Sequence, residues 1–74
     1  MEKVHIRGHH ITLGQLLKLS GIAQTGGQAK FMVADGRVRI NGRITFQRGK
    51  KVFPGDIVGL DGRDVIEVRP GEQG

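Results

Sequence analysis

The sequence of 74 residues contains no cysteine, no tryptophan and no tyrosine. Without cysteine the chain has no disulfide to stabilise it and no thiolate to bind a metal ion. No apolar run approaches the roughly 18 residues that a membrane-spanning helix needs, and the polar start, MEKVHIRGHH, lacks the apolar stretch of a signal peptide. We therefore expect one cytoplasmic domain, residues 1–74, that has no membrane partner.

Negative charge is absent from one long segment of the sequence. Residues 36–55 carry six cations and no acid, while residues 56–74 carry two cations and five acids. The six cations are Arg37, Arg39, Arg43, Arg48, Lys50 and Lys51. A local excess of this kind is typical of a surface that binds a polyanion, and arginine can hold phosphate oxygens with two parallel hydrogen bonds. From charge alone a second interpretation stays open, in which the cations are a solvated edge that keeps a small sheet from pairing with other chains.

Two segments predict short helices, each opened by a threonine. Thr12 is a favourable N-cap with Gln15 three residues later, and Thr25 is followed in the same way by Gln28. Each pair has the spacing of a capping box, in which the two residues exchange hydrogen bonds between side chain and backbone. A glycine stands at the natural end of each segment.

The second helix leaves one large apolar side chain without an evident place. Ala29, Met32 and Val33 share a face that would pack in the core, and Phe31 points away from that face. We expect Phe31 to pack beneath the N-terminal or the C-terminal strand, and stacking on a base is the alternative.

Beyond the helices the apolar period changes from helical to two, which predicts short strands. The stretch RVRI alternates and leads into an NG turn. Because the alternation places Ile44 and Phe46 in the core, we predict a three-residue bulged loop that sets Ile40 opposite Ile44 and leaves Arg43 at its tip.

The rest of the chain predicts further strands separated by turns. Pro54-Gly55 and Asp61-Gly62 are turn pairs, and a strand follows each of them. The alternation assigns Phe53 to the core, and residues 69–74 are expected to be a loose tail. Together with a first strand at KVHIRG, these elements predict an α+β fold: a single small domain with an N-terminal strand, two short helices and then a short antiparallel sheet.

The stretch TGGQAKFMVADGRVRINGR and the later PGD resemble a known pattern. In the RNA-binding domain family named after ribosomal protein S-four, also called the α-L motif, two short helices precede a strand and turn of the form G-x-V-x-V/I-N-G and then a PGD turn. The resemblance is to the small free-standing YbcJ/YaaA-like members in particular, and it covers roughly residues 11–62. The matching residues are Gly36, Val38, Ile40, Asn41, Gly42, Pro54, Gly55 and Asp56.

The resemblance implies a partner and a contact surface. The family binds structured RNA, such as ribosomal or transfer RNA, through the helix pair and the following strand and turn, so the ribosome is a further expected partner. The resemblance also implies cationic contact positions at Lys30 on the second helix and at Arg37, Arg39 and Arg43 beyond that helix. This chain has TLGQ where the first helix of the family often opens with R-L-D-K, and GG where the second often opens with arginines. These departures shift the expected contacts to the cations of the strand and loops.

The sequence therefore predicts a binding protein without chemistry of its own. We expect phosphate contacts to hold structured RNA, with binding driven by the release of counterions. The expected RNA-binding residues are Lys30, Arg37, Arg39, Arg43, Arg48, Lys50 and Lys51. An accessory phosphate contact is expected at Gly26, Gly27 and Lys18, since a helix start offers free N–H groups to an anion; an ordinary capped start is the alternative. With only three aromatic residues, recognition of RNA shape or backbone is expected rather than a base-stacking platform.

Other activities find little support in the sequence. No catalytic triad or carboxylate pair stands out, and no cofactor is expected. His5, His9 and His10 do not have the spacing of a zinc site, so no metal is expected. Two alternatives to RNA binding stay open: a protein-interaction module that docks on a ribosomal or other acidic partner, and an accessory regulator of an RNA-modifying enzyme.

Overall fold

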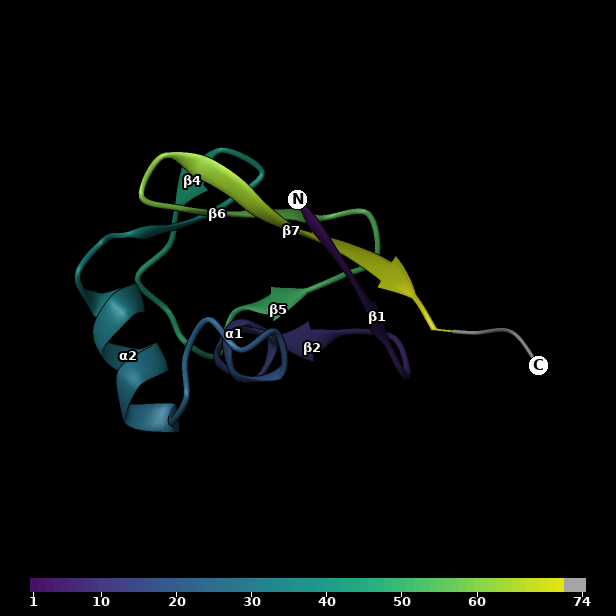
Figure 1. Ribbon diagram of the computed structural model, residues 1–74, viewed down its shortest axis with the longest axis horizontal. Coiled ribbons are helices and arrows are strands. Elements are labelled where there is room, and N and C mark those ends of the chain that lie inside the picture. The colour runs from purple at the N-terminus through teal and green to yellow at the C-terminus, as the bar shows by residue number, and fades with distance from the viewer. Residues whose placement is uncertain (72–74) are drawn as a thin grey trace.

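A five-stranded mixed sheet lies against two short helices, which both sit on one side of it (Figure 1). The computed structural model describes residues 1–71. Its elements, in chain order, are β1 Glu2–Ile6, β2 Ile11–Thr12, α1 Leu13–Leu19, α2 Gly26–Ala34, β3 Val38–Ile40, β4 Arg43–Ile44, β5 Lys51–Val52, β6 Ile57–Leu60 and β7 Arg63–Pro70. Within these residues no helix is long and apolar enough to cross a membrane. The α+β fold expected from the sequence is confirmed.

The sheet has the strand order β1-β7-β6-β3-β4, and β2 and β5 form a separate two-stranded pair. All neighbours are antiparallel except β1 and β7, which run parallel. The expected antiparallel sheet is therefore a mixed one. A parallel pair needs a long crossover connection, and here that connection contains both helices and all the other strands.

The parallel pair also corrects the expected tail. Arg69 and Pro70, which the sequence assigned to a loose end, are the last residues of β7 and lie opposite His5 and Ile6 of β1. Pairing with β1, which is distant in sequence, holds them in the sheet. Residues 72–74 of the expected tail lie outside the described residues.

Both helices begin at the threonines that the sequence indicated. At α1, Thr12 Oγ1 accepts a hydrogen bond from the Gln15 backbone N–H, and the Gln15 side chain accepts one from the Thr12 N–H, so the capping box is confirmed. At α2, Thr25 Oγ1 accepts from the Gln28 N–H at 3.0 Å. The second capping box predicted that the Gln28 side chain would accept a hydrogen bond from the Thr25 N–H. That prediction was wrong, because the Gln28 side chain accepts from the N–H of Gln24 instead, at 2.6 Å.

The core lies between the helices and the sheet and is made of aliphatic side chains. The largest side chains that are fully buried are Leu13, Leu16, Leu17, Val33, Val38, Val52, Val58, Ile66 and Val68. They come from α1, α2, β3, β5, β6 and β7, so one core joins both helices to both sheets. No polar or charged residue among those described is buried.

The hairpin between β3 and β4 differs from the bulged form predicted from the sequence. Ile40 lies opposite Arg43, and Arg39 opposite Ile44, so the loop has only the two residues Asn41 and Gly42. Their φ angles of 51° and 84° are both left-handed, as in the type I′ turn that matches the twist of two antiparallel strands. The predicted bulge was wrong because it assumed that Ile44 must reach the core, whereas Ile44 is 45% exposed on the edge strand β4.

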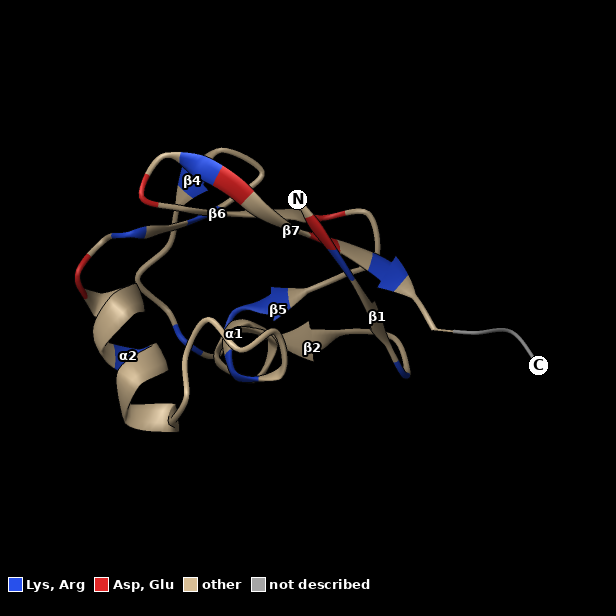
Figure 2. Ribbon diagram, viewed as in Figure 1, with Lys and Arg blue, Asp and Glu red and all other residues tan. Residues whose placement is uncertain are grey.

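An exposed ion pair joins Arg37, which precedes β3, to Asp61 in the turn between β6 and β7. Figure 2 shows acidic and basic segments of the ribbon near one another at that turn. Arg37 donates from Nε to Asp61 Oδ1 at 2.9 Å and from Nη2 to Asp61 Oδ2 at 2.8 Å. The Asp61 backbone N–H also donates to the Arg37 carbonyl at 2.9 Å. The hydrogen bond from Arg37 holds the pKa of Asp61 below its ordinary value, and the same bond raises the pKa of Arg37.

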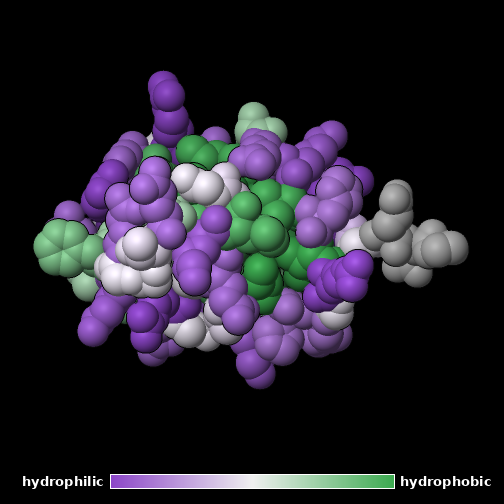
Figure 3. Space-filling view, turned by 60° about the horizontal axis from the view of Figure 1, so that its bottom comes forward, coloured by the Kyte–Doolittle hydropathy of each residue, from purple (hydrophilic) through white to green (hydrophobic). Residues whose placement is uncertain are grey.

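All three phenylalanines are exposed, contrary to the sequence-based assignment. Phe31 is 79% exposed on the outer face of α2, Phe46 is 66% exposed and Phe53 is 37% exposed. Aliphatic side chains already fill the core, so the phenylalanines lie outside it. Phe46 lies against Gly36, where an added Cβ would be 3.3 Å from its Cε1 atom. Figure 3 shows that apolar side chains also reach one face of the molecule, where hydrophilic ones surround them.

The left-handed turn gives a test of the hairpin. We expect Gly42→Ala to lower the free energy of unfolding by about 1–2 kcal/mol, since an L-residue is strained in this conformation. Gly49→Ala is the matched control, because Gly49 has no left-handed φ and no atom near an added Cβ. Its stability should stay the same or rise slightly. Urea unfolding followed by far-UV circular dichroism measures both; equal losses would contradict the observed turn.

The Arg37–Asp61 pair predicts a pH dependence of stability. Because the pKa of Asp61 is lower in the folded chain, its stabilisation is present above the unfolded pKa, near 3.8, and is lost as the pH falls through the folded value. Asp61→Asn keeps a residue that tolerates the left-handed φ of 51° and removes the charge. We expect a small loss of stability at neutral pH, because solvent screens so exposed a pair.

The stability lost in Asp61→Asn relative to the wild type should shrink below about pH 4. Urea titrations of the wild type and Asp61→Asn at several pH values measure it, with Asp64→Asn as the control for removing one exposed surface carboxylate. A loss of equal size at neutral and at strongly acidic pH would show that the ion pair is not its cause.

Candidate nucleic-acid interface

Four of the six cations of residues 36–55 line two cavities of the described structure, and two line neither of these cavities. Arg48 lines a pocket at the helix starts, whereas Arg43, Lys50 and Lys51 line a groove beside the β3–β4 hairpin. Arg37 and Arg39 line neither cavity. The sequence predicted these side chains as one contact surface, and whether the two cavities belong to a single surface stays a prediction.

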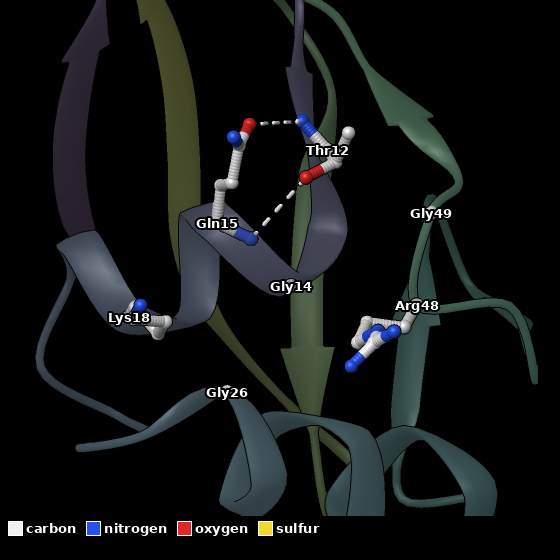
Figure 4. Close-up of a pocket in the computed structure, with 7 residues that line it drawn as sticks. All are labelled: Thr12, Gly14, Gln15, Lys18, Gly26, Arg48 and Gly49. Atoms are coloured by element: carbon white, nitrogen blue, oxygen red, sulfur yellow. Dashed lines mark hydrogen bonds between the residues drawn. The ribbon is translucent and has the colours of Figure 1, made fainter.

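The basic pocket lies where α1, the start of α2 and the loop before β5 meet (Figure 4). It has a volume of about 210 Å³. Its lining residues are Thr12, Gly14, Gln15, Lys18, Gly26, Arg48 and Gly49. Figure 4 shows the Arg48 side chain reaching from its loop towards α1 and the first residue of α2. The expected accessory residues Lys18 and Gly26 thus lie in one cavity with Arg48, and Gly27 is outside its lining.

Gly14 is the residue that makes this arrangement possible, and the sequence analysis did not single it out as a site residue. A Cβ on Gly14 would lie 2.6 Å from Cγ of Arg48, so the Arg48 side chain would have to move to admit it. The Gly14 N–H donates to the Arg48 carbonyl at 2.9 Å. A glycine in the first turn of a helix, where it costs helical stability, was the available signal.

The start of α2 adds electrostatic attraction for an anion. The first N–H groups of a helix have no partner within the helix and carry the positive end of its dipole. Added Cβ atoms at Gly26 and Gly27 would meet no atom closer than 3.9 Å, so there is open space beside both residues, and Gly26 lines the pocket. A phosphate there could contact the backbone of Gly26 together with Lys18 and Arg48.

The basic groove has a volume of about 440 Å³ and carries more positive than negative charge. Its residues are Ile40, Asn41, Arg43, Ile44, Thr45, Lys50, Lys51, Phe53 and Asp56. Three of them are cations and one is an acid. All three cations are exposed, so their charges can meet a ligand from solvent.

The single carboxylate of the groove is already occupied by protein groups. Asp56 Oδ1 accepts from Asn41 Nδ2 at 3.0 Å, and Oδ2 accepts from the Phe53 N–H at 2.8 Å. Asn41 Oδ1 in turn accepts from the Ile57 N–H at 2.9 Å. The NG turn and the PGD turn are therefore joined side by side, and Asp56 faces its partners rather than competing with a ligand for the cations.

The remaining predicted contact residues lie outside both cavities. The guanidinium of Arg37 is held by Asp61, which offsets its charge. Arg39 is exposed and donates from Nη1 to the Gly42 carbonyl at 3.2 Å. Lys30 is exposed on α2. Among residues 1–71, no group of three or more His, Asp or Glu side chains is placed to hold a metal ion.

Comparison with known proteins agrees with this architecture. The S4 domain family matches residues 4–69, nearly the whole chain. A Bacillus subtilis (strain 168) protein named "Probable ribosome maturation protein RlbA" is 42% identical over 58 residues, which cover 78% of this chain and 82% of that protein. The Escherichia coli (strain K12) protein named "Putative RNA-binding protein YbcJ" is 36% identical over 56 residues, covering 76% of this chain and 80% of that protein.

A solved structure shows the same fold. The crystal structure of the 30S ribosomal protein S4e from Thermoplasma acidophilum superimposes with a TM-score of 0.54 and 21% sequence identity. The match covers 76% of this chain and 29% of that protein. With a family match over residues 4–69 and relatives that align along most of their length, the chain belongs to the S4 domain family.

Proposed function

We propose that the chain binds structured RNA through the cations on and around the basic loop, residues 48–51. The observation that carries this proposal is the position of that loop. Its carbonyls at Arg48 and Lys50 accept hydrogen bonds from the N–H groups of Gly14 and Leu13, at 2.9 and 2.8 Å. Arg48 then faces the pocket, while Lys50 and Lys51 face the groove.

The binding would depend mainly on phosphates. Lys18 and Arg48 in the pocket, together with Arg43, Lys50 and Lys51 in the groove, could contact about three to five phosphates, and each contact releases condensed counterions. No acid lies on α1, on β5 or in the basic loop, so nothing within these segments opposes that charge. Such contacts position a protein on folded RNA without reading its sequence.

The relatives support the choice of RNA over other polyanions. One is named as an RNA-binding protein and another as a ribosome maturation protein, and both align with about four-fifths of their own length. We therefore propose ribosomal RNA as the first partner to test and transfer RNA as the second. The proposed role is binding without chemistry of its own, and its proposed place is the cytoplasm, where these RNAs occur.

A second candidate function, docking on a protein, is favoured by exposed apolar side chains. Phe31 and Leu19 are 79% and 61% exposed, although both are large and apolar. Figure 3 shows an apolar area within a hydrophilic face. A purified ribosomal protein that binds the wild type after nuclease treatment, and loses affinity for Phe31→Ser, would favour this candidate over RNA binding.

Salt dependence tests RNA binding directly. We expect the affinity for fragmented bacterial ribosomal RNA to fall steeply as salt rises, with a logarithmic slope of about −2 to −4 for three to five phosphate contacts. Filter binding across a salt series measures it, with transfer RNA and duplex DNA as competitors. An affinity that did not change with salt would contradict the proposed phosphate contacts.

Single substitutions test the two cavities. Arg48→Ala and Lys51→Ala should each weaken binding several-fold and reduce the magnitude of the salt slope by about 1. Arg37→Ala should have less effect, because Asp61 already holds that guanidinium. Arg63→Ala, an exposed cation on β7 next to acidic residues, is the control and should bind like the wild type. If Arg37→Ala or Arg63→Ala weakened binding as much as Arg48→Ala, the assignment of the cavities would be wrong.

A further inference from the structure

Phe53 places an aromatic ring in the wall of the basic groove. Alternation assigned it to the core, but it is 37% exposed. Two contacts hold it in place. Its N–H donates to Asp56 at 2.8 Å, and its ring packs against His9 and His10 with centroid separations of 5.4 and 5.8 Å. Phe53 is therefore held against the two histidines outside the core, and it is exposed where it lines the groove.

The groove has three properties that suit a nucleotide: its volume, its apolar lining and its cations. Its volume of about 440 Å³ lies within the range of roughly 300–1,000 Å³ that is usual for small-ligand sites. Phe53, Ile40 and Ile44 supply apolar surface for the face of a base. The cations Arg43, Lys50 and Lys51 supply partners for the flanking phosphates.

The polar groups at the back of the groove do not oppose this ligand. Asp56 accepts from both Asn41 and Phe53, so each of its oxygens already has a protein donor, and the three cations of the groove outnumber its single charge. A uniform RNA duplex could reach the cations with its backbone, but it would keep the faces of its bases stacked and out of reach of Phe53. An unpaired nucleotide can present a base face and two phosphates to one groove.

We infer that the basic groove holds one unpaired RNA nucleotide, with its base stacked on Phe53 and its phosphates beside Arg43, Lys50 and Lys51. This inference rests on the proposed RNA binding and adds to it a structural class of partner: helical RNA that carries a bulged or looped-out nucleotide. The charge of the groove favours a nucleotide over a neutral or basic peptide as its occupant.

Two RNA hairpins test the inference. They share one stem, and one of them carries a single bulged 5-iodouridine. The wild-type chain should bind the bulged hairpin about 5- to 100-fold more tightly than the fully paired one, which is the range expected for one base stacked on an aromatic side chain. Phe53→Leu should lose this preference and keep its affinity for the paired hairpin, while Phe53→Tyr should retain the preference. Phe31→Leu, an exposed phenylalanine outside the groove, is the matched control.

Photocrosslinking gives a readout on the unaltered chain. Irradiation of the wild-type complex should attach the iodouridine to Phe53, as mapped by mass spectrometry, and attachment to residues outside the groove would overturn the inference. Circular dichroism shows whether Phe53→Leu is folded; if it is not, the wild-type preference and the crosslink decide.

The outcomes separate this inference from the proposed function. Equal affinity of the wild type for both hairpins would overturn the inference, leave RNA binding intact and assign the groove to another occupant. Failure to bind either hairpin or ribosomal RNA fragments at low salt would overturn the proposed function, and the inference with it. A preference that survived in folded Phe53→Leu would show that Phe53 is not the stacking partner.

Discussion

Two backbone hydrogen bonds at the start of α1 determine where the basic loop lies. The first N–H groups of a helix have no partner inside it, and here Leu13 and Gly14 donate to the carbonyls of Lys50 and Arg48. The same contact continues into the β2–β5 pair, in which Ile11 lies opposite Val52. A loop of cations is thereby attached to a helix start by groups that carry no net charge. Gly14 leaves room for the Arg48 side chain, since an added Cβ would lie 2.6 Å from Cγ of Arg48 but 3.5 Å from its carbonyl oxygen.

The charge available on the surface differs from the charge counted in the sequence. Residues 36–55 contain six cations, but Arg37 is paired with an aspartate 24 residues away, and Arg39 lies outside both cavities. Lys18, expected from the sequence as an accessory contact, lines the same pocket as Arg48. An ion pair over a long sequence distance thus offsets one predicted cation, and helix packing places another in a cavity with Arg48.

The motif residues act chiefly through their contacts with one another. Asn41 of the NG turn and Asp56 of the PGD turn are hydrogen-bonded at 3.0 Å, across 15 positions of sequence. Gly42 and Gly55 adopt left-handed φ angles of 84° and 97°, as their turns require. The two turns together form one wall of the basic groove. The family pattern therefore describes a scaffold, and the proposed RNA contacts come from the cations and Phe53 that line its cavities.

Most features set by neighbours within a few residues were predicted from the sequence, with the β3–β4 register and the Gln28 side-chain bond as exceptions, whereas pairings between distant segments were not. The helix starts at Thr12 and Thr25, the turn pairs Pro54-Gly55 and Asp61-Gly62 and the strands that follow them all depend on neighbours within a few residues. The S4 family could also be identified from the sequence, because its pattern is an ordered series of such local features.

Only the tertiary structure decided the parallel pairing of β1 with β7, the register of the β3–β4 hairpin, the division of the cations and the exposure of the three phenylalanines. Alternation states which side chains share a face, but whether that face is covered depends on what packs against it. Here apolar residues other than phenylalanine, from the seven elements β1, α1, α2, β3, β5, β6 and β7, fill the core, so the phenylalanines lie outside it.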